Sequence, residues 1–188
     1  MSFMLLGILN AQATGGGAGA FDLLETTTLT SSASSVTFSG LDAYSDYKHL
    51  QIRHISRLDT AFSGGTVFFN LNGDTGSNYA RHFILGSGSS VTVTAQSSVV
   101  YGDAANSVGG AEATSIFGGA VLDILDFSST SKNTTTRALG GVAGSSYYSI
   151  KLVSSLWNNT SAVTSINLNT LGSGNFVAGS RFSLYGVK

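Results

Sequence analysis

Hydrophobic residues from Phe21 onward occur in short runs broken by alternating polar positions, which is the period of a half-buried β-strand. The run that begins at Leu50 is the clearest, because Leu50 and Ile52 alternate with Gln51 and Arg53. The same reasoning, together with enrichment in β-prone residues, predicts strands at 26–30, 35–38, 50–55, 66–71, 79–85, 90–94, 99–101, 120–127, 134–139, 147–153, 163–168 and 181–185.

Turn residues separate these segments, and the segments mostly begin 8 to 16 residues apart. Asn72 and Gly73 tolerate positive φ and predict a tight turn, with 66–71 and 79–85 as the two strands of a hairpin. Helical patterns are nearly absent, and only 111–116 suggests a short helical turn. This rhythm is typical of an antiparallel sandwich or barrel. We therefore expect an all-β fold, specifically an antiparallel, jelly-roll-like β-sandwich over residues 21–188 with an extended N-terminal arm.

The predicted arm, residues 1–20, is uncharged and contains a Gly-rich stretch at 15–19. Its apolar side chains are Phe3, Met4, Leu5, Leu6, Ile8 and Leu9. Burial of such side chains stabilises by about 1.5–3 kcal/mol each, which could offset the entropy lost when a Gly-rich segment is ordered. We expect an assembly arm that docks on a neighbouring chain, with folding back onto its own domain as the alternative. Ala11-Gln12-Ala13 matches a signal-peptidase site, but the required basic residues before the apolar run are absent.

The composition of the chain excludes several classes of function. Only 10% of residues are charged, against about 25% in a typical soluble domain, and the chain has no Cys and no Pro. A net charge of -1 gives no electrostatic footprint for nucleic acid or an anionic membrane surface, and the apolar run is too short to insert across a membrane. Strands with so few charges lack the Lys residues that usually protect sheet edges. We therefore expect a homo-oligomer, with a trimer as the favoured state.

No residue pattern predicts an enzyme, a cofactor or a metal site. His49 and His54 are five residues apart on one strand, so their side chains should point to opposite faces. The segment 70–78 has oxygen-bearing side chains at alternate positions but lacks the terminal Glu of a calcium loop. Asp123 and Asp126 are three apart in a strand and should also face apart, which excludes a paired-carboxylate site.

Aromatic side chains are candidates for contact with a sugar or a protein, although most of them should fill the core. Trp157 is the first candidate for a surface contact, because it precedes Asn158 and Asn159 in a segment that reads as a loop.

Four stretches of the chain resemble one family when taken together. They are Leu5-Leu6-Gly7-Ile8-Leu9-Asn10-Ala11-Gln12, Tyr47-Lys48-His49-Leu50-Gln51-Ile52-Arg53, Asn72-Gly73-Asp74-Thr75-Gly76-Ser77-Asn78-Tyr79 and Ala178-Gly179-Ser180-Arg181-Phe182-Ser183-Leu184-Tyr185-Gly186. The chain resembles small, tail-fibre-like structural proteins of tailed bacteriophages from marine and environmental sources. These motifs are structural and carry no chemistry.

The resemblance implies a virion component that is assembled in the host cytoplasm and contacts other virion proteins. A tail or fibre-type appendage is the first expectation, with a host surface glycan as a further candidate partner. The alternatives are a capsid decoration protein that clamps the head shell and, outside the virion, a free carbohydrate-binding module.

Overall fold

The computed structural model describes residues 19–172 and 174–188, and this part of the chain forms an all-β structure. It contains no α-helix, and one 3₁₀ turn, η1 (Leu41–Tyr44), connects two strands. The strands are β1 (Phe21–Thr28), β2 (Ser35–Ser39), β3 (His49–Ser56), β4 (Gly64–Leu71), β5 (Tyr79–Ser87), β6 (Ser90–Val99), β7 (Gly102–Val108), β8 (Gly118–Leu125), β9 (Thr134–Ala143), β10 (Tyr148–Trp157), β11 (Ser165–Asn169) and β12 (Arg181–Val187).

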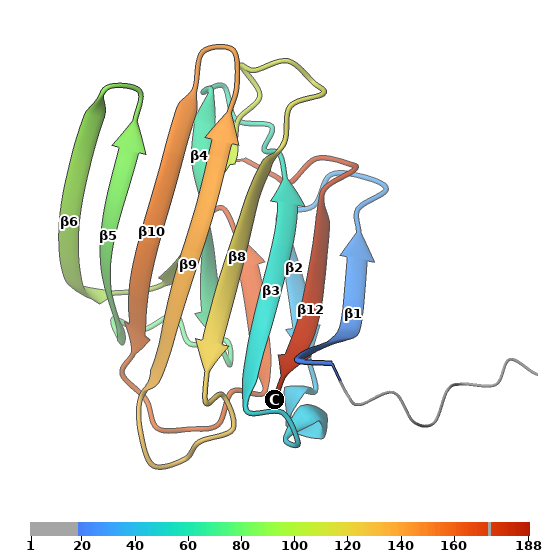
Figure 1. Ribbon diagram of the computed structural model, residues 1–188, viewed down its shortest axis with the longest axis vertical. Helices are drawn as coiled ribbons and strands as arrows, with labels where there is room; N and C mark the ends of the chain where they lie inside the picture. Colours follow the sequence, from blue (N-terminus) through green and yellow to red (C-terminus); the bar gives the residue numbers. More distant parts are fainter. Residues whose placement is uncertain (1–18, 173) are drawn as a thin grey trace, which may run out of the picture.

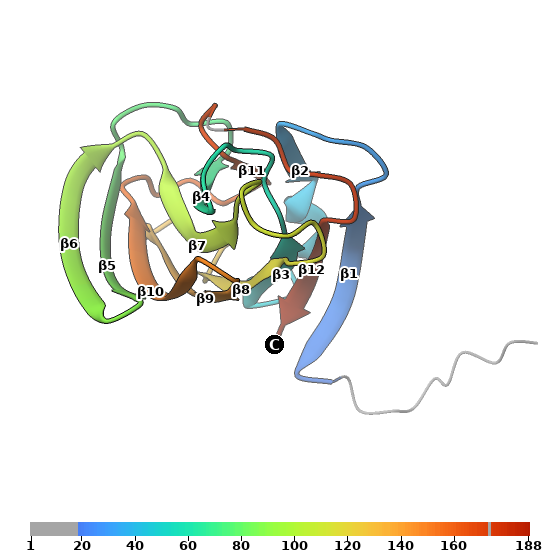
Figure 2. The same cartoon turned by 90° about the horizontal axis from the view of Figure 1, so that it is seen from above.

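The strands form two antiparallel sheets that enclose a common core, in a sandwich-like arrangement (Figures 1 and 2). The larger sheet has eight strands in the order β1-β12-β3-β8-β9-β10-β5-β6, and the smaller has four in the order β2-β11-β4-β7. Figure 1 shows the larger sheet in front, with β1 at its right edge and β6 at its left edge. The all-β, antiparallel part of the sequence prediction is confirmed.

The core lies between the sheets because each strand buries alternate side chains. In β3, Leu50, Ile52 and His54 are buried, as the period-2 pattern predicts. The largest fully buried side chains include Trp157, Tyr79, Phe38, Phe69, Phe127, Phe176 and Phe182. The sheets are therefore held together mainly by aromatic and aliphatic burial.

The larger sheet extends beyond the smaller one at the β5–β6 side (Figure 2). None of the ten residues of β6 is buried, whereas every residue of β7 is buried beneath β9 and β10. The larger sheet therefore ends in a hairpin whose outer strand is exposed on both faces.

Two sequence expectations about the strands are wrong. Strands β4 and β5 do not form a hairpin, because they belong to different sheets. The predicted tight turn between them is present: Asn72 and Gly73 both have positive φ, and the Asp74 N–H donates to the Leu71 carbonyl at 2.9 Å. The predicted strand at 99–101 is replaced by β7 at Gly102–Val108. The segment 111–116 belongs to no helix but contains a short turn, in which the Ile116 N–H donates to the Ala113 carbonyl at 3.0 Å.

Candidate functional site

Six large aliphatic side chains form an exposed patch on the outer surface of the larger sheet. We call this patch the apolar face, and it consists of Ile84, Val91, Val93, Leu139, Ile150 and Leu152. Their exposed fractions range from 48% for Ile84 to 72% for Val91. An exposed, contiguous apolar surface of this kind marks an interaction site.

The pairing register makes the apolar face continuous across four strands. Val93 of β6 lies opposite Ile84 of β5, which lies opposite Leu152 of β10, which in turn lies opposite Leu139 of β9. Residues directly opposite each other in an antiparallel pair project to the same side of the sheet. The four side chains therefore form one row, and Val91 and Ile150 lie two positions further along their strands on the same side.

Strand β10 shows why the apolar face is exposed: its alternation of apolar and polar side chains is opposite to that of an ordinary half-buried strand. Its outward positions include Tyr148, Ile150 and Leu152, which are 52%, 62% and 53% exposed. Its five inward positions are all buried, and three of them are polar: Ser149, Lys151 and Ser155 beside Val153 and Trp157. Register normally turns the apolar set of a strand toward the core. Here the more apolar face of β10 points to solvent, which indicates a surface that requires a cover.

A chain of hydrogen-bonded polar side chains borders the apolar face on one side. The Arg53 Nε donates to Gln51 Oε1 at 2.8 Å, and the Gln51 amide donates to Asp123 at 2.7 Å. Arg137 completes this chain with a 2.9 Å contact from its Nε to the other carboxylate oxygen of Asp123. A shallow depression of about 350 Å³ lies where the two regions meet, with Leu152, Ile84 and Leu125 in its lining.

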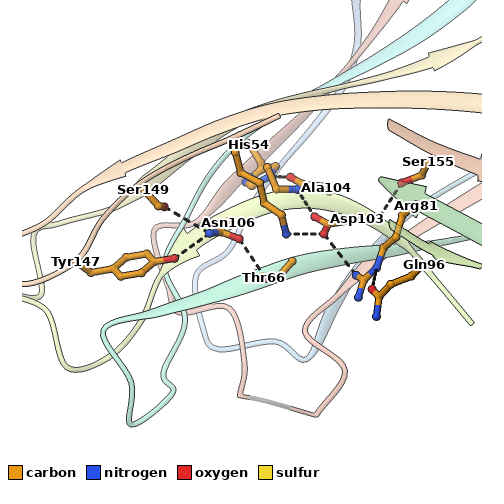
Figure 3. Close-up of polar contacts among 12 residues, drawn as sticks. His54, Thr66, Arg81, Gln96, Asp103, Ala104, Asn106, Tyr147, Ser149 and Ser155 are labelled. Atoms are coloured by element: carbon orange, nitrogen blue, oxygen red, sulfur yellow. Dashed lines mark hydrogen bonds and ion pairs between the residues drawn. The ribbon is translucent and has the colours of Figure 1, made fainter. Parts of the chain in front are cut away.

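Beneath the apolar face lies a buried ion cluster (Figure 3). The Lys151 ammonium is 2.5 Å from Asp103 Oδ2, and Arg81 Nη1 is 3.4 Å from the same oxygen. The other oxygen of Asp103 accepts the N–H of Ala105 at 2.9 Å. Burial lowers the pKa of Lys151, and the charge of Asp103 opposes that shift. The cluster joins β5, β7 and β10, and its carboxylate is saturated by protein donors, so it links the two sheets.

His54 is buried behind this cluster and is held by protein groups. Its ring nitrogens lie 3.1 Å from Ser56 Oγ and 3.2 Å from the carbonyl of Ala104, which Figure 3 shows close to it. The ring also stacks on Phe182, with 5.6 Å between the ring centroids. Burial lowers the pKa of His54 to about 4, although the bond to Ala104 acts in the opposite direction. The ring is therefore neutral at pH 7.

Among the residues considered for metal binding or acid–base chemistry, His49 and Asp126 lie side by side, with His49 Nδ1 3.4 Å from Asp126 Oδ1. His49 accepts the backbone N–H of Asp126 at 2.8 Å and lies on the opposite face of β3 from buried His54. Asp126 pairs with Lys132, and Asp123 pairs with Arg137. Among residues 19–172 and 174–188, no three His, Asp or Glu side chains gather as a metal site would require.

Trp157 is buried, whereas the sequence suggested a position on the surface. It is the last residue of β10, only 2% of it is exposed, and its indole Nε1 donates to Asp74 Oδ2 at 2.7 Å. Asp74 also accepts from the Gly76 N–H and from the Asn78 amide. The acidic turn that resembled a calcium loop thus uses its carboxylate to anchor the core tryptophan, and the indole bond is the first cause that lowers the pKa of Asp74.

A second buried network, which the sequence did not reveal, fixes the loop between β7 and β8. The Arg57 guanidinium donates to four carbonyls of that loop, from Gly110, Glu112, Ala113 and Ile116, at 2.6–3.2 Å. The Glu112 carboxylate in turn accepts hydrogen bonds from the backbone and hydroxyl groups of Ser145 and Ser146. These bonds, led by the Ser146 hydroxyl, lower the pKa of Glu112 to about 2. The network is structural, because its polar groups already satisfy one another.

The expected arm residues Phe3, Met4, Leu5, Leu6, Ile8 and Leu9 lie outside the described residues. No helix within the described part of the chain is long and apolar enough to cross a membrane. Comparison with known proteins finds no matching family model, no similar curated protein and no similar solved structure.

Proposed function

We propose that this chain is a non-enzymatic structural subunit of a bacteriophage virion, most simply a small oligomeric tail or fibre-type appendage. The observation that carries the proposal is the apolar face: six aliphatic side chains that a working subunit would cover by contact with its neighbours. The resemblance of the four sequence stretches to small phage structural proteins supplies the biological setting.

The strand order supports a jelly-roll-like interpretation of the fold. If β5–β6 and β9–β10 are set aside, the remaining strands form two four-stranded sheets, β1-β12-β3-β8 and β2-β11-β4-β7. Along the chain, β1 and β2 lie in different sheets, as do β3 and β4, and β7 and β8. Eight strands in two facing sheets with this kind of alternation are typical of jelly rolls, an architecture used by viral capsid and lectin domains.

The two remaining hairpins, β5–β6 and β9–β10, extend one sheet of this eight-stranded unit. All six residues of the apolar face belong to these four strands. A jelly roll whose larger sheet is widened by strands with an apolar outer side is the arrangement expected when that side serves assembly. A capsid decoration role is the second candidate, because the same architecture occurs in capsid proteins.

The copy number in purified particles tests the proposal and separates its two forms. We expect quantitative mass spectrometry to find the chain in particles at a few to tens of copies for an appendage. A ratio near one per major capsid subunit would identify a decoration protein instead. Absence from particles would refute the virion proposal and favour the free carbohydrate-binding module.

A further inference from the structure

Strand β6 forms an edge of the larger sheet and carries no charged side chain that would protect it. Its ten residues, Ser90–Val99, include no charged side chain, and no Pro occurs in the chain. It pairs with β5 on one side, and no described strand pairs with it on the other. Because antiparallel hydrogen bonding alternates, every second residue of such a strand directs its N–H and C=O groups toward the unpaired side. A long, uncharged edge is a template for another strand.

The opposite edge of the same sheet is built differently. Strand β1 carries Asp22 and Glu25, and its pairing with β12 is interrupted by an irregularity between Leu23 and Glu25. Charges and bulges are the devices that natural sheets use to block edge-to-edge pairing. Figure 1 shows the two edges far apart, at opposite ends of the sheet. Strand β6 also has an irregularity, between Gln96 and Val99, so the two edges differ in charge: β1 carries two acidic side chains and β6 carries none.

We propose that β6 pairs with β6 of a second copy of this chain, antiparallel, and joins the two eight-stranded sheets into one. This inference rests on the proposed structural function and names the partner for one of its surfaces. A second copy fits because the strand has no charges that would repel their own duplicates across a two-fold axis. The contact closes on itself as a dimer, whereas pairing of β6 with β1 would be heterologous and would produce a ring or an open filament.

The symmetry of this contact also determines how the apolar faces of the two copies lie relative to each other. Two strands that run antiparallel side by side are related by a two-fold axis perpendicular to the sheet. Such an axis keeps each face of the sheet on its own side, so the apolar faces of both copies become one surface of doubled width. The regular stretch 90–96 of β6 has Val93 at its centre, so full pairing of this stretch places Val93 of each copy beside its counterpart, with Val91 two positions along each strand. The contact yields even-numbered assemblies rather than the trimer that the sequence suggests.

Thr92 allows a test that leaves the apolar face intact. It is exposed, and it lies opposite Leu85, on the other side of the sheet from Val91 and Val93. With the axis at Val93, position 92 lies opposite position 94 of the second copy, so charges at position 92 of the two copies are diagonal neighbours, about 7–8 Å apart. We therefore expect both Thr92→Lys and Thr92→Glu to weaken dimer formation by at least about tenfold, since neighbouring like charges are strongly unfavourable in an interface.

An equimolar mixture of the Lys and Glu variants should recover the dimer, because each mixed dimer then has opposite charges across its β6–β6 contact. Native mass spectrometry resolves this mixed dimer by its mass, and sedimentation measures its affinity. Thr92→Ser keeps a small neutral side chain and should dimerise like the wild type. Thr28→Lys places the same charge on the β1 edge and should have no effect on dimerisation. Circular dichroism melting verifies that each variant is folded.

Several outcomes would overturn the inference. The full-length wild-type chain could be monomeric at about 100 μM, where even a micromolar dimer would be mostly formed. It could form open-ended polymers, which would indicate β1–β6 pairing, or both charged variants could dimerise normally. Failure here is distinguishable from failure of the proposed function, because a chain that is monomeric in solution can still be found in purified particles.

Discussion

Replacing two residues at the centre of the apolar face should weaken assembly much more than it changes the fold. Ile150 and Leu152 are 62% and 53% exposed and lie on the outward side of the central strand β10. Full burial of such a side chain stabilises by about 1.5–3 kcal/mol, so covering the exposed part of each contributes about 1–2 kcal/mol. The double variant Ile150→Ser, Leu152→Ser should lose about 2–4 kcal/mol of association free energy per copy, a weakening of about 30- to 900-fold.

Sedimentation equilibrium of the purified chain measures this change, and incorporation into particles shows whether the same surface works in assembly. Phe62→Ser is the matched control, because Phe62 is 75% exposed but lies outside the apolar face, in the loop before β4. The control should assemble like the wild type. If the double variant assembles as well as the wild type, or if the control is equally impaired, the apolar face is not the assembly surface.

Three further predictions concern the buried polar networks. Lys151→Met leaves the Asp103 carboxylate with Arg81 as its one remaining ionic partner, so urea denaturation should show a loss of about 3 kcal/mol of unfolding free energy. Folding depresses the pKa of Glu112 from 4.5 to about 2. The stability that the Glu112 carboxylate contributes is therefore present above about pH 4.5 and is lost as the pH falls toward 2. Over that pH range, the urea midpoint of Glu112→Gln should fall less than the urea midpoint of the wild type. Trp157→Phe removes the indole donor, which should cost about 1.5–3 kcal/mol and raise the pKa of Asp74 measured by NMR titration; an unchanged pKa would contradict the role assigned to this bond.

Much of the fold could be predicted because its local signals are strong. Alternation in β3 and the positive-φ preference of Asn72-Gly73 are properties of a few neighbouring residues, and both appear in the structure as expected. Strand β7 was missed because Gly102-Asp103-Ala104-Ala105-Asn106 has the composition of a turn. Its burial depends on β9 and β10, which follow it in the sequence and cover it in space.

The apolar face and the ion cluster beneath it could not be predicted either, because they also depend on contacts between residues distant in the sequence. Lys151 lies between Ile150 and Leu152, and alternation alone suggests that the aliphatic pair faces the core. The structure places Lys151 inside, because Asp103, 48 residues earlier, supplies the compensating charge there. Trp157 reads as a loop residue beside two asparagines, yet Asp74, 83 residues away, holds its indole in the core.

The sequence by itself determined the secondary-structure class, the spacing of most strands, the tight turn at Asn72-Gly73 and the low charge of the surface, because each depends on local propensity or on composition. Tertiary structure decided which strands share a sheet, which face of β10 points outward and where the buried ions pair. These features arise from contacts between residues far apart in the chain, since the free energy of a buried charge or an exposed aliphatic side chain depends on its neighbours in space. The apolar face and the unprotected edge of β6 belong to this second group, and both proposals about assembly derive from them.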